Sequence, residues 1–460
     1  MAAAEKGKKK RAPLSSFTIL LIILVVLAIV TVIMSASGVE GVQGATLSQV
    51  LTAPVFGFQD AIGVCLFVMI LGGFLGIVTE TGALDAGIAA LVHKLKGNEL
   101  VLIPILMAIF SIGGTTYGMC EETVPFYLLL AATMVAAGFD SLTGAAVVLL
   151  GAGCGVLGST VNPFAVGVAV DALSGIGIAV NQGIIIALGA ILWLTTTIIS
   201  IIFVMRYAKK VKADPKFSYS YEDREKFNAQ WELDESGAAA REFGLRKKIV
   251  LVIFVAAFII MIVGVMNLGW WFPQMAAEFV TLSILVMFIG GTGKDGVGEA
   301  KMVDAFGAGA SSLVPVALII GLARGVNHVL TEGMISDTML NAASNLVAGM
   351  SGPLFVVCLL LIFFVLGFVV PSSSGLAVLA MPIFAPLADT VGIPRWIIVA
   401  AYQFGQYAML YIAPTGLVMA TLQMLDMKMS HWFKFVWPMM VFTLVFGAIL
   451  LSICSVVFAV

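Results

Sequence analysis

Charged residues are scarce in this sequence. Only 11% of its 460 residues are Asp, Glu, Lys or Arg, whereas soluble domains carry about a quarter. Histidine and cysteine are also few, with three scattered histidines and five cysteines that form no Cys-x-x-Cys pair. These shortages argue against a disulfide framework, a zinc site, and the nucleophile–base pair or metal cluster of a membrane enzyme. We expect free thiols, no enzyme activity, no cofactor and no nucleic-acid partner.

Apolar residues make up 61% of the chain, and several runs reach the roughly 18 residues that a bilayer crossing needs. The sequence therefore predicts an all-α polytopic membrane protein in contact with the lipid bilayer. The first run, residues 17–34, resembles a signal peptide because small residues follow it. However, it is longer than the usual signal core of about 7–15 residues. We interpret it as a spanning helix, with the basic tail of residues 1–16 on the cytoplasmic side.

One stretch between apolar segments is polar and rich in glycine: Gly113-Gly114-Thr115-Thr116-Tyr117-Gly118-Met119-Cys120-Glu121-Glu122. Irregular backbone within a membrane is tolerated only where protein or a water-filled cavity satisfies its N–H and C=O groups. The apolar segment before this stretch, residues 100–112, is short for a span. We therefore interpret residues 99–138 as a re-entrant hairpin with its tip at this stretch. A full crossing is the alternative.

A second interruption divides the apolar residues 141–173 at Gly158-Ser159-Thr160-Val161-Asn162-Pro163. Proline removes one backbone donor and clashes with the preceding helical turn. Together with Gly158 and a run of hydroxyl and amide side chains, it predicts a helix that is broken rather than kinked.

The second half of the chain repeats this order of segments. Its hairpin has the tip Pro371-Ser372-Ser373-Ser374-Gly375, and its broken helix has the break Ile412-Ala413-Pro414-Thr415-Gly416. Each half contributes four crossings and one hairpin, so each half starts and ends on the same side of the membrane. The single connector helix between them therefore inverts the second half. Inverted repeats with broken helices are an architecture of secondary transporters. The predicted segments are repeat 1 (17–206, broken helix 141–173), a solvated cytoplasmic linker (207–247), the connector (248–267) and repeat 2 (277–460, hairpin 353–392, broken helix 394–426).

Two hairpin tips and two helix breaks should meet in this architecture and form a solute site. Carbonyl oxygens freed near Asn162, Pro163, Pro414 and Thr415 can coordinate a monovalent cation such as Na⁺. Helix N-termini at the tips can instead hold a carboxylate of the solute. For each single residue, capping of a buried helix end is an equally good explanation. The predicted substrate-binding residues are Thr115, Thr116, Glu121, Glu122, Ser159, Thr160, Asn162, Ser372, Ser373, Ser374 and Thr415.

The charge of these elements bears on the solute, because they carry Glu121 and Glu122 but no Lys or Arg. Uncompensated carboxylates favour a cationic solute group or a coupling ion, since charge at membrane depth is normally paired. At most one of the two faces the solute, because adjacent helical residues point about 100° apart. A dianionic solute would need an arginine. The candidate, Arg324, belongs to a scaffold helix, where pairing with Glu80 or Glu332 is slightly preferred.

A stripe of polar and aromatic residues precedes the second break. Packing inside the helix bundle explains such a stripe at least as well as contact with the solute does. Its members are Tyr402, Gln403, Gln406, Tyr407 and Tyr411.

The two tips and the first break resemble those of the YfcC group. That group is a branch of the anaerobic four-carbon-dicarboxylate carrier family in the ion transporter superfamily. The resemblance covers nearly the whole chain from residue 17, although the tips have Gly-Thr-Thr and Ser-Ser-Ser in place of the Ser-Asn-Thr of the sodium–dicarboxylate branch. It implies an elevator-type ion transporter fold, a multi-pass protein of the prokaryotic inner membrane, and often a homodimer. Members of the group are commonly described as basic amino acid antiporters.

We therefore expect a secondary active transporter for a small charged organic solute, foremost a basic amino acid moved by arginine/ornithine-type exchange. Glu121 or Glu122 would pair with the positive group of the solute, and the hydroxyl-bearing tips would hold its carboxylate. The alternative is a cation-coupled four-carbon dicarboxylate carrier, in which the glutamates serve the ion. A channel fits less well because two opposed hairpins indicate alternating access. The coupling ion, Na⁺ or H⁺, stays open.

Overall fold

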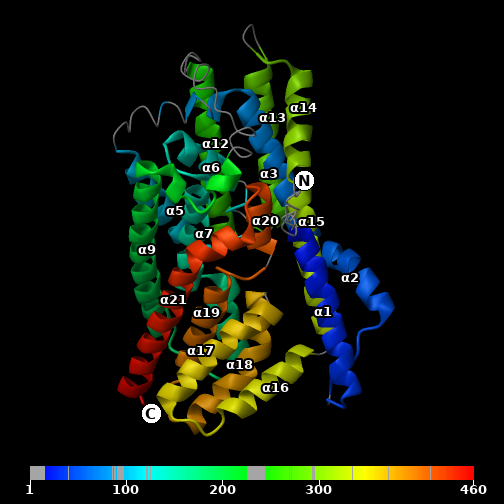
Figure 1. Cartoon of the computed structure of the whole chain (residues 1–460), viewed down its shortest axis with the longest axis vertical. Coiled ribbons are helices and arrows are strands. Elements are labelled where there is room, and N and C mark those ends of the chain that lie inside the picture. The colour runs from blue at the N-terminus through cyan, green and yellow to red at the C-terminus, as the bar shows by residue number, and fades with distance from the viewer. Residues whose placement is uncertain are drawn as a thin grey trace, which may run out of the picture.

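The protein is all-helical in the part of the chain that the structure covers. The computed structural model describes residues 16–459 except 40, 85, 88–89, 91–97, 121–122, 125, 225–243, 269, 271, 293–295, 334, 371 and 415. Nine helices within these residues are long and apolar enough to cross a membrane. A multi-pass helical membrane protein, as predicted, accounts for this arrangement (Figure 1).

One group of helices is built on two long helical segments that are each interrupted once. Helix α2 (Leu47–Asp60) continues after Ala61 as α3 (Ile62–Glu80), and α14 (Glu299–Ser312) continues after Leu313 as α15 (Val314–Glu332). The two segments run in opposite directions, so that α2 packs against α15 and α3 packs against α14 (Figure 1). The group is completed by α1 (Ser16–Ala36) on α15, α13 (Phe272–Gly291) on α3, and α12 (Leu245–Leu268) on α13.

Small residues let these two segments approach closely, and they do so in a reciprocal way. A Cβ atom on Gly57 would lie 2.3 Å from the carbonyl oxygen of Gly321, and one on Gly325 would lie 2.7 Å from that of Ala53. At the α3–α14 contact, four residues repeat this arrangement: Gly309 faces Gly72, and Gly76 faces Ala305. Small residues spaced four apart are a common means of close helix packing in membranes, where lipid supplies no hydrophobic drive.

The second group of helices contains the segments that we predicted to form the two hairpins and the two broken helices. Helices α5 and α6 pack on α7, and in the same way α17 and α18 pack on α19. In Figure 1 the α5–α6 pair lies in the upper half and the α17–α18 pair in the lower half. The members are α5 (Leu102–Tyr117), α6 (Phe126–Ala136), α7 (Ser141–Leu157), α8 (Val168–Gly175), α9 (Gln182–Ala213), α17 (Gly352–Val369), α18 (Ser373–Thr390), α19 (Trp396–Met409), α20 (Gly416–Met424) and α21 (Met429–Val457).

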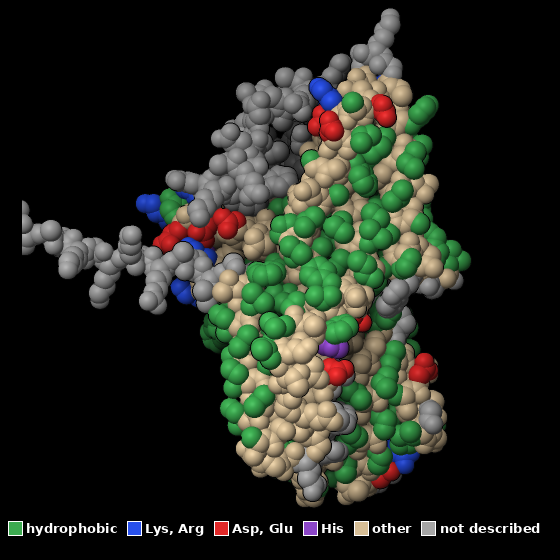
Figure 2. All heavy atoms as spheres, turned by 90° about the vertical axis from the view of Figure 1, so that its right-hand side faces the viewer, with side chains coloured by type: hydrophobic (Ala, Val, Ile, Leu, Met, Phe, Trp, Pro, Cys, Tyr) green, Lys and Arg blue, Asp and Glu red, His purple; other side chains and the backbone are tan. Residues whose placement is uncertain are grey.

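The two groups meet mainly through apolar side chains. Helix α20 packs on α15, and α12 packs on α5. The rings of Phe126 and Phe258 lie 4.4 Å apart across this boundary. On the side of α1, α2 and α14, hydrophobic side chains are spread over the surface (Figure 2), as expected for a face toward lipid.

The connection that follows α9 begins later than the linker that we predicted from residue 207, and part of it is held against α7. Helix α9 continues to Ala213, and Ser218 and Ser220 are buried. Both the Tyr207 hydroxyl (2.6 Å) and the Ser218 hydroxyl (2.5 Å) donate to Asp140, at the start of α7. The remaining linker residues 225–243 lie outside the described part of the chain. In the second half, α16 (Ile335–Val347) lies between α15 and α17.

Candidate functional site

The first hairpin tip and the first helix break are hydrogen-bonded to each other. The Thr115 hydroxyl donates to the carbonyl oxygen of Gly158 at 2.8 Å. The carbonyl oxygen of Thr115 in turn accepts from the N–H groups of Thr160 (3.0 Å) and Val161 (3.4 Å) and from the Thr160 hydroxyl (3.1 Å). The tip and the break therefore form one structural unit.

Glycine allows the tip to fit against the break. Helix α5 ends at Gly118, which has φ +84°, a left-handed conformation that is costly for residues with a Cβ atom. A Cβ atom at this position would also lie 2.7 Å from the Asn162 amide. One turn earlier, a Cβ atom on Gly114 would lie 2.4 Å from the carbonyl oxygen of Ala152 in α7. Bulkier residues at either position would push the tip away from the break.

The polar side chains of the first break cap its own backbone. The Ser159 hydroxyl donates to the carbonyl oxygen of Val156 at 2.6 Å, and the Asn162 amide donates to the Ser159 hydroxyl at 3.0 Å. The Asn162 side-chain oxygen accepts from the N–H of Phe164 at 2.9 Å. A π-helical turn, Pro163–Gly167, then leads into α8. Ser159 and Asn162 are fully buried, so they act as capping residues in this state.

Two elements of the second half also reach the first break. The Gln403 amide in α19 donates to the carbonyl oxygens of Leu157 (3.1 Å) and Ser159 (3.0 Å). The Ser374 hydroxyl at the second tip donates to the carbonyl oxygen of Phe164 at 2.9 Å. Three of the four predicted elements thus meet at one junction, which we call the tip–break junction: Gly113–Gly118, Leu157–Phe164 and Ser372–Gly375.

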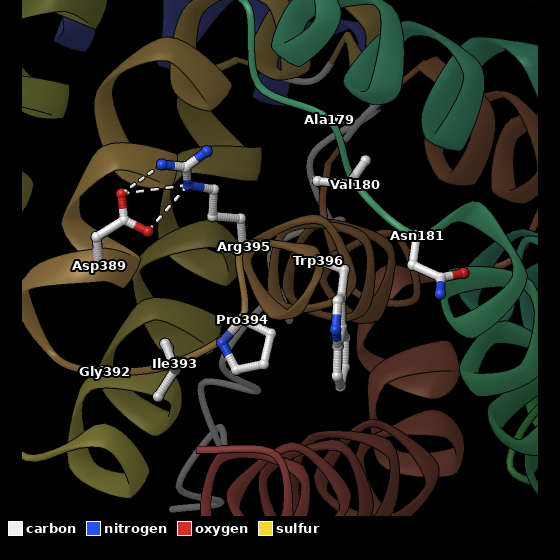
Figure 3. A pocket seen from close by; sticks show the side chains of 9 residues that line it. All are labelled: Ala179, Val180, Asn181, Asp389, Gly392, Ile393, Pro394, Arg395 and Trp396. Atoms are coloured by element: carbon white, nitrogen blue, oxygen red, sulfur yellow. Dashed lines mark hydrogen bonds and ion pairs between the residues drawn. The ribbon is translucent and has the colours of Figure 1, made fainter. Parts of the chain in front are cut away.

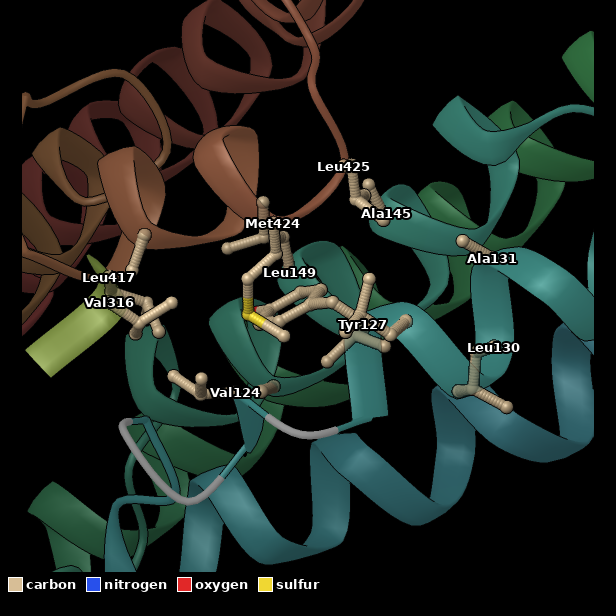
Figure 4. Packing of buried hydrophobic residues seen from close by; sticks show 14 of the residues in the cluster. Val124, Tyr127, Leu130, Ala131, Ala145, Leu149, Val316, Leu417, Met424 and Leu425 are labelled. Atoms are coloured by element: carbon tan, nitrogen blue, oxygen red, sulfur yellow. The ribbon is translucent and has the colours of Figure 1, made fainter. Parts of the chain in front are cut away.

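The second break lies beside the far arm of the first hairpin. Its Tyr411 carbonyl oxygen accepts from the Trp432 indole at 2.8 Å, and the Tyr411 hydroxyl lies 3.4 Å from the Cys154 sulfur in α7. Beyond the break, Leu417 and Met424 of α20 pack near Val124 and Val316 (Figure 4). The described residues that pack between α20 and the first hairpin are mostly apolar.

Most remaining predicted site residues are engaged with their own helices. The Thr116 hydroxyl donates to the carbonyl oxygen of Ile112 at 2.7 Å. Ser372 caps α18 by accepting from the N–H of Gly375 at 3.1 Å. The Ser373 carbonyl oxygen accepts from the buried Tyr402 hydroxyl at 2.7 Å, whereas the half-buried Ser373 hydroxyl makes no hydrogen bond within the described chain. Glu121, Glu122 and Thr415 lie outside the described residues.

Arg324 does not pair as predicted. Its guanidinium lies 3.7 Å from the carboxylate of Asp60, rather than next to Glu80 or Glu332, and both partners are partly exposed. The reason is the packing of α15 on α2, which brings the end of α2 to Arg324. This arginine belongs to the contact between the two interrupted segments and not to the tip–break junction.

A cavity of about 320 Å³ lies elsewhere, between the α8–α9 and α18–α19 connections. Asp389, Arg395 and Trp396 are among its lining residues (Figure 3). The Arg395 guanidinium already donates to the Asp389 carboxylate at 2.6 Å. Asp389 is 16 residues after Ser373 along α18, roughly 24 Å at 1.5 Å per residue. The cavity is therefore separate from the junction.

Two residues proved important that the sequence had not singled out for these roles. Gln403 had been grouped with the packing stripe, yet it satisfies two carbonyl oxygens of the first break. Asp140 caps α7 by accepting from the N–H of Thr143 at 2.8 Å. An Asp directly before an apolar run indicates a helix cap in the sequence. Its long-range partners, Tyr207 and Ser218, cannot be identified from the sequence. The five cysteines are free thiols.

Helix breaks and polar tips enclosed in a bundle of apolar helices define a polytopic membrane transporter. The chain belongs to the DcuC family, the C4-dicarboxylate anaerobic carriers, whose family model matches residues 14–456. It is thus a carrier rather than an enzyme.

Two relatives align with most of the chain. An uncharacterized protein of Haemophilus influenzae is 47% identical over 408 residues, which are 88% of this chain and 78% of that protein. YfcC of Escherichia coli, provisionally named a basic amino acid antiporter, is 34% identical over 384 residues, 82% of this chain and 74% of YfcC.

Two solved structures are loosely similar. The YdaH transporter of Alcanivorax borkumensis has a TM-score of 0.41 at 14% identity, with 96% of this chain and 98% of that chain covered. MtrF of Neisseria gonorrhoeae has a TM-score of 0.42 at 19% identity, with coverage of 96% and 95%.

Proposed function

We propose that this protein is a secondary active transporter that moves a small charged organic solute by an elevator type of alternating access. The observation that carries the proposal is the tip–break junction. There, a hairpin tip from each half of the chain is hydrogen-bonded to the same helix break. Enclosed polar backbone of this kind is the usual setting of solute and ion sites in secondary transporters.

The contacts between helices support an inverted repeat. The packing of α1 on α15 has a counterpart in α13 on α3, and α2 on α15 has one in α14 on α3. The contacts of α5 with α7 and α9 correspond to those of α17 with α19 and α21. The segments α2–α3 and α14–α15 run in opposite directions (Figure 1), as an inverted repeat requires of corresponding elements.

The division into two helix groups supports the elevator. The close glycine contacts of α2–α3 with α14–α15 suit a fixed scaffold, because backbones in direct contact resist sliding. The boundary with the second group is apolar at Phe126–Phe258 and at α15–α20. An apolar boundary has few hydrogen bonds to break when one group moves against the other.

The solute we propose is a basic amino acid, exchanged in the arginine/ornithine manner. Glu121 and Glu122 supply negative charge to a set of elements without Lys or Arg, which favours a cationic group. The unengaged Ser373 hydroxyl and the first N–H groups of α18 can receive a carboxylate. The provisional name of YfcC points to the same solute class. We further propose Na⁺ or H⁺ coupling, a homodimer, and an inner-membrane location with the N-terminus in the cytoplasm.

A dicarboxylate is the second candidate, because the family description names C4-dicarboxylates. In that case Glu121 and Glu122 would serve a coupling cation, together with backbone oxygens near Asn162 and Pro414. Carbonyl oxygens of Leu157, Gly158 and Ser159 already accept hydrogen bonds, so a cation at this break would have to share or displace those donors.

Uptake into proteoliposomes distinguishes these solutes. The full-length protein is reconstituted with ornithine or fumarate inside, and the entry of labelled arginine and succinate is measured. Arginine entry that requires internal ornithine, and that is lost in the Glu121→Gln/Glu122→Gln double variant, supports basic amino acid exchange. Succinate entry against fumarate, or unchanged arginine exchange in the double variant, contradicts it. Flux that ignores the internal solute and does not saturate contradicts a carrier altogether.

A further inference from the structure

Glu278 is a carboxylate without a hydrogen-bond partner in the described chain, and it lies inside a helix that is long and apolar enough to span a membrane. It is the seventh residue of α13 (Phe272–Gly291), which is apolar enough to cross a bilayer. At 1.5 Å per residue it lies roughly 9 Å from the start of the helix. The 20 residues of α13 are about as long as a hydrocarbon core of roughly 30 Å is thick, so a crossing by this helix places Glu278 inside the core. Both carboxylate oxygens are buried, and neither makes a hydrogen bond to any residue that the structure describes.

Charged groups on the helices packed against α13 lie near its opposite end. Helix α3 carries only Glu80 and Cys65 as ionisable groups, and Thr81, next to Glu80, contacts Gly290. Helix α12 carries Arg246, Lys247 and Lys248 in its first turn, and Arg246 donates to the carbonyl oxygen of Thr292 at 2.7 Å.

Helix α14 follows the same pattern. It carries Glu299, Lys301 and Asp304, and the N–H of Glu299 lies next to Gly291. The distance along α13 from Glu278 to Gly291 is roughly 20 Å. Cys65 donates to the carbonyl oxygen of Ala317 and so faces α15. No cation therefore neutralises Glu278 from the described part of these helices.

An ionised carboxylate in this position would be very costly, since both oxygens are buried and the described part of the helices packed on α13 offers no countercharge. A buried group in that situation takes up a proton instead of keeping its charge. Helix α1 packs on α15 in the same way as α13 packs on α3, and α1 has no charged residue. The fold itself therefore does not require an acid at this position. An ionisable residue in a membrane span that no packing need explains is by default a functional site.

We propose that Glu278 is a proton-binding site in the scaffold group of helices. Its carboxyl holds a proton in the described state, and the proton is the ligand. This inference does not depend on which solute is carried, and it stands separately from the tip–break junction.

Infrared spectroscopy of the full-length protein in lipid nanodiscs tests the proposal without any solute. The wild-type protein should show the band of a protonated carboxyl near neutral pH, where exposed carboxyls are ionised. Glu278→Gln should lose this band, and the control Glu80→Gln, at an exposed carboxylate on the end of α3, should keep it. A band of equal intensity in wild type and Glu278→Gln overturns the proposal.

A second variant covers the case in which Glu278→Gln does not fold. Glu278→Asp keeps a carboxyl in a slightly different environment, so its protonated band should shift in frequency while that of Glu80→Asp stays where it is in the wild type. A band that is unmoved in Glu278→Asp assigns the proton to another carboxyl and overturns the proposal.

Discussion

The backbones of Gly309 and Gly72 are in direct contact. A Cβ atom on Gly309 would lie 2.3 Å from the carbonyl oxygen of Gly72, closer than any real Cβ contact. The same relationship joins Gly57 and Gly321 at the other crossing of the two interrupted segments. These contacts hold α2–α3 closely against α14–α15.

Replacing Gly309 by alanine should destabilise the protein. The added methyl group meets backbone that cannot rotate away, and overpacking of this kind costs about 1–3 kcal/mol. Thermal unfolding of the purified protein in detergent measures the effect. Gly307→Ala is the matched control in the same helix, because a Cβ atom there meets nothing within 4 Å and alanine has the higher helix propensity. Equal unfolding temperatures for the two variants would contradict the close contact.

Serines 373 and 374 should respond differently to alanine. Ser374→Ala removes the hydrogen bond to the Phe164 carbonyl oxygen, which is worth about 0.5–1.5 kcal/mol, and should lower the unfolding temperature. Ser373→Ala removes a hydroxyl that is unengaged in the described chain, so stability should stay unchanged while the KM of uptake rises. A KM unchanged from wild type in Ser373→Ala would remove this hydroxyl from the proposed site.

Gln403→Leu should disturb the first helix break. Leucine has a similar size but leaves the carbonyl oxygens of Leu157 and Ser159 without their common donor. An unsatisfied buried acceptor costs about 1–3 kcal/mol, so both the unfolding temperature and the uptake rate should fall. Gln423→Leu, at an exposed position in α20, serves as the control and should leave both unchanged. If Gln403→Leu matches this control, the amide does not hold the break.

Asp140→Ala should release the connection after α9. The Asp140 carboxylate accepts from the Thr143 N–H, the Tyr207 hydroxyl and the Ser218 hydroxyl. Loss of the helix cap alone costs about 0.5–2 kcal/mol. Limited proteolysis should then cut within residues 214–224 several times faster than in the wild type. Asp171→Ala, an exposed acid in α8, should leave the cutting rate unchanged. Equal rates for Asp140→Ala and wild type would show that other contacts hold this connection.

Much of the architecture follows from local features of the sequence. In lipid, a long apolar run of a chain like this one satisfies its backbone N–H and C=O groups by forming a helix, because each group then finds its hydrogen-bond partner within the same segment. Pro163 lacks an N–H and Gly118 accepts a left-handed conformation, so an interruption near each was predictable. The family followed from the same short motifs, since their residues are unusual between apolar segments.

The tertiary structure alone decided which groups meet. Gln403 and Ser159 are 244 residues apart, and their hydrogen bond depends on how α19 crosses α7. Arg324 pairs with Asp60 because α15 packs on α2, a choice that no local pattern encodes. Likewise, the sequence shows Glu278 only as one acid in an apolar segment. Only the packing of α13 shows that the charged residues of α3, α12 and α14 lie toward its other end. Helix formation is a local property of the chain, whereas partner choice depends on distances between segments far apart in sequence.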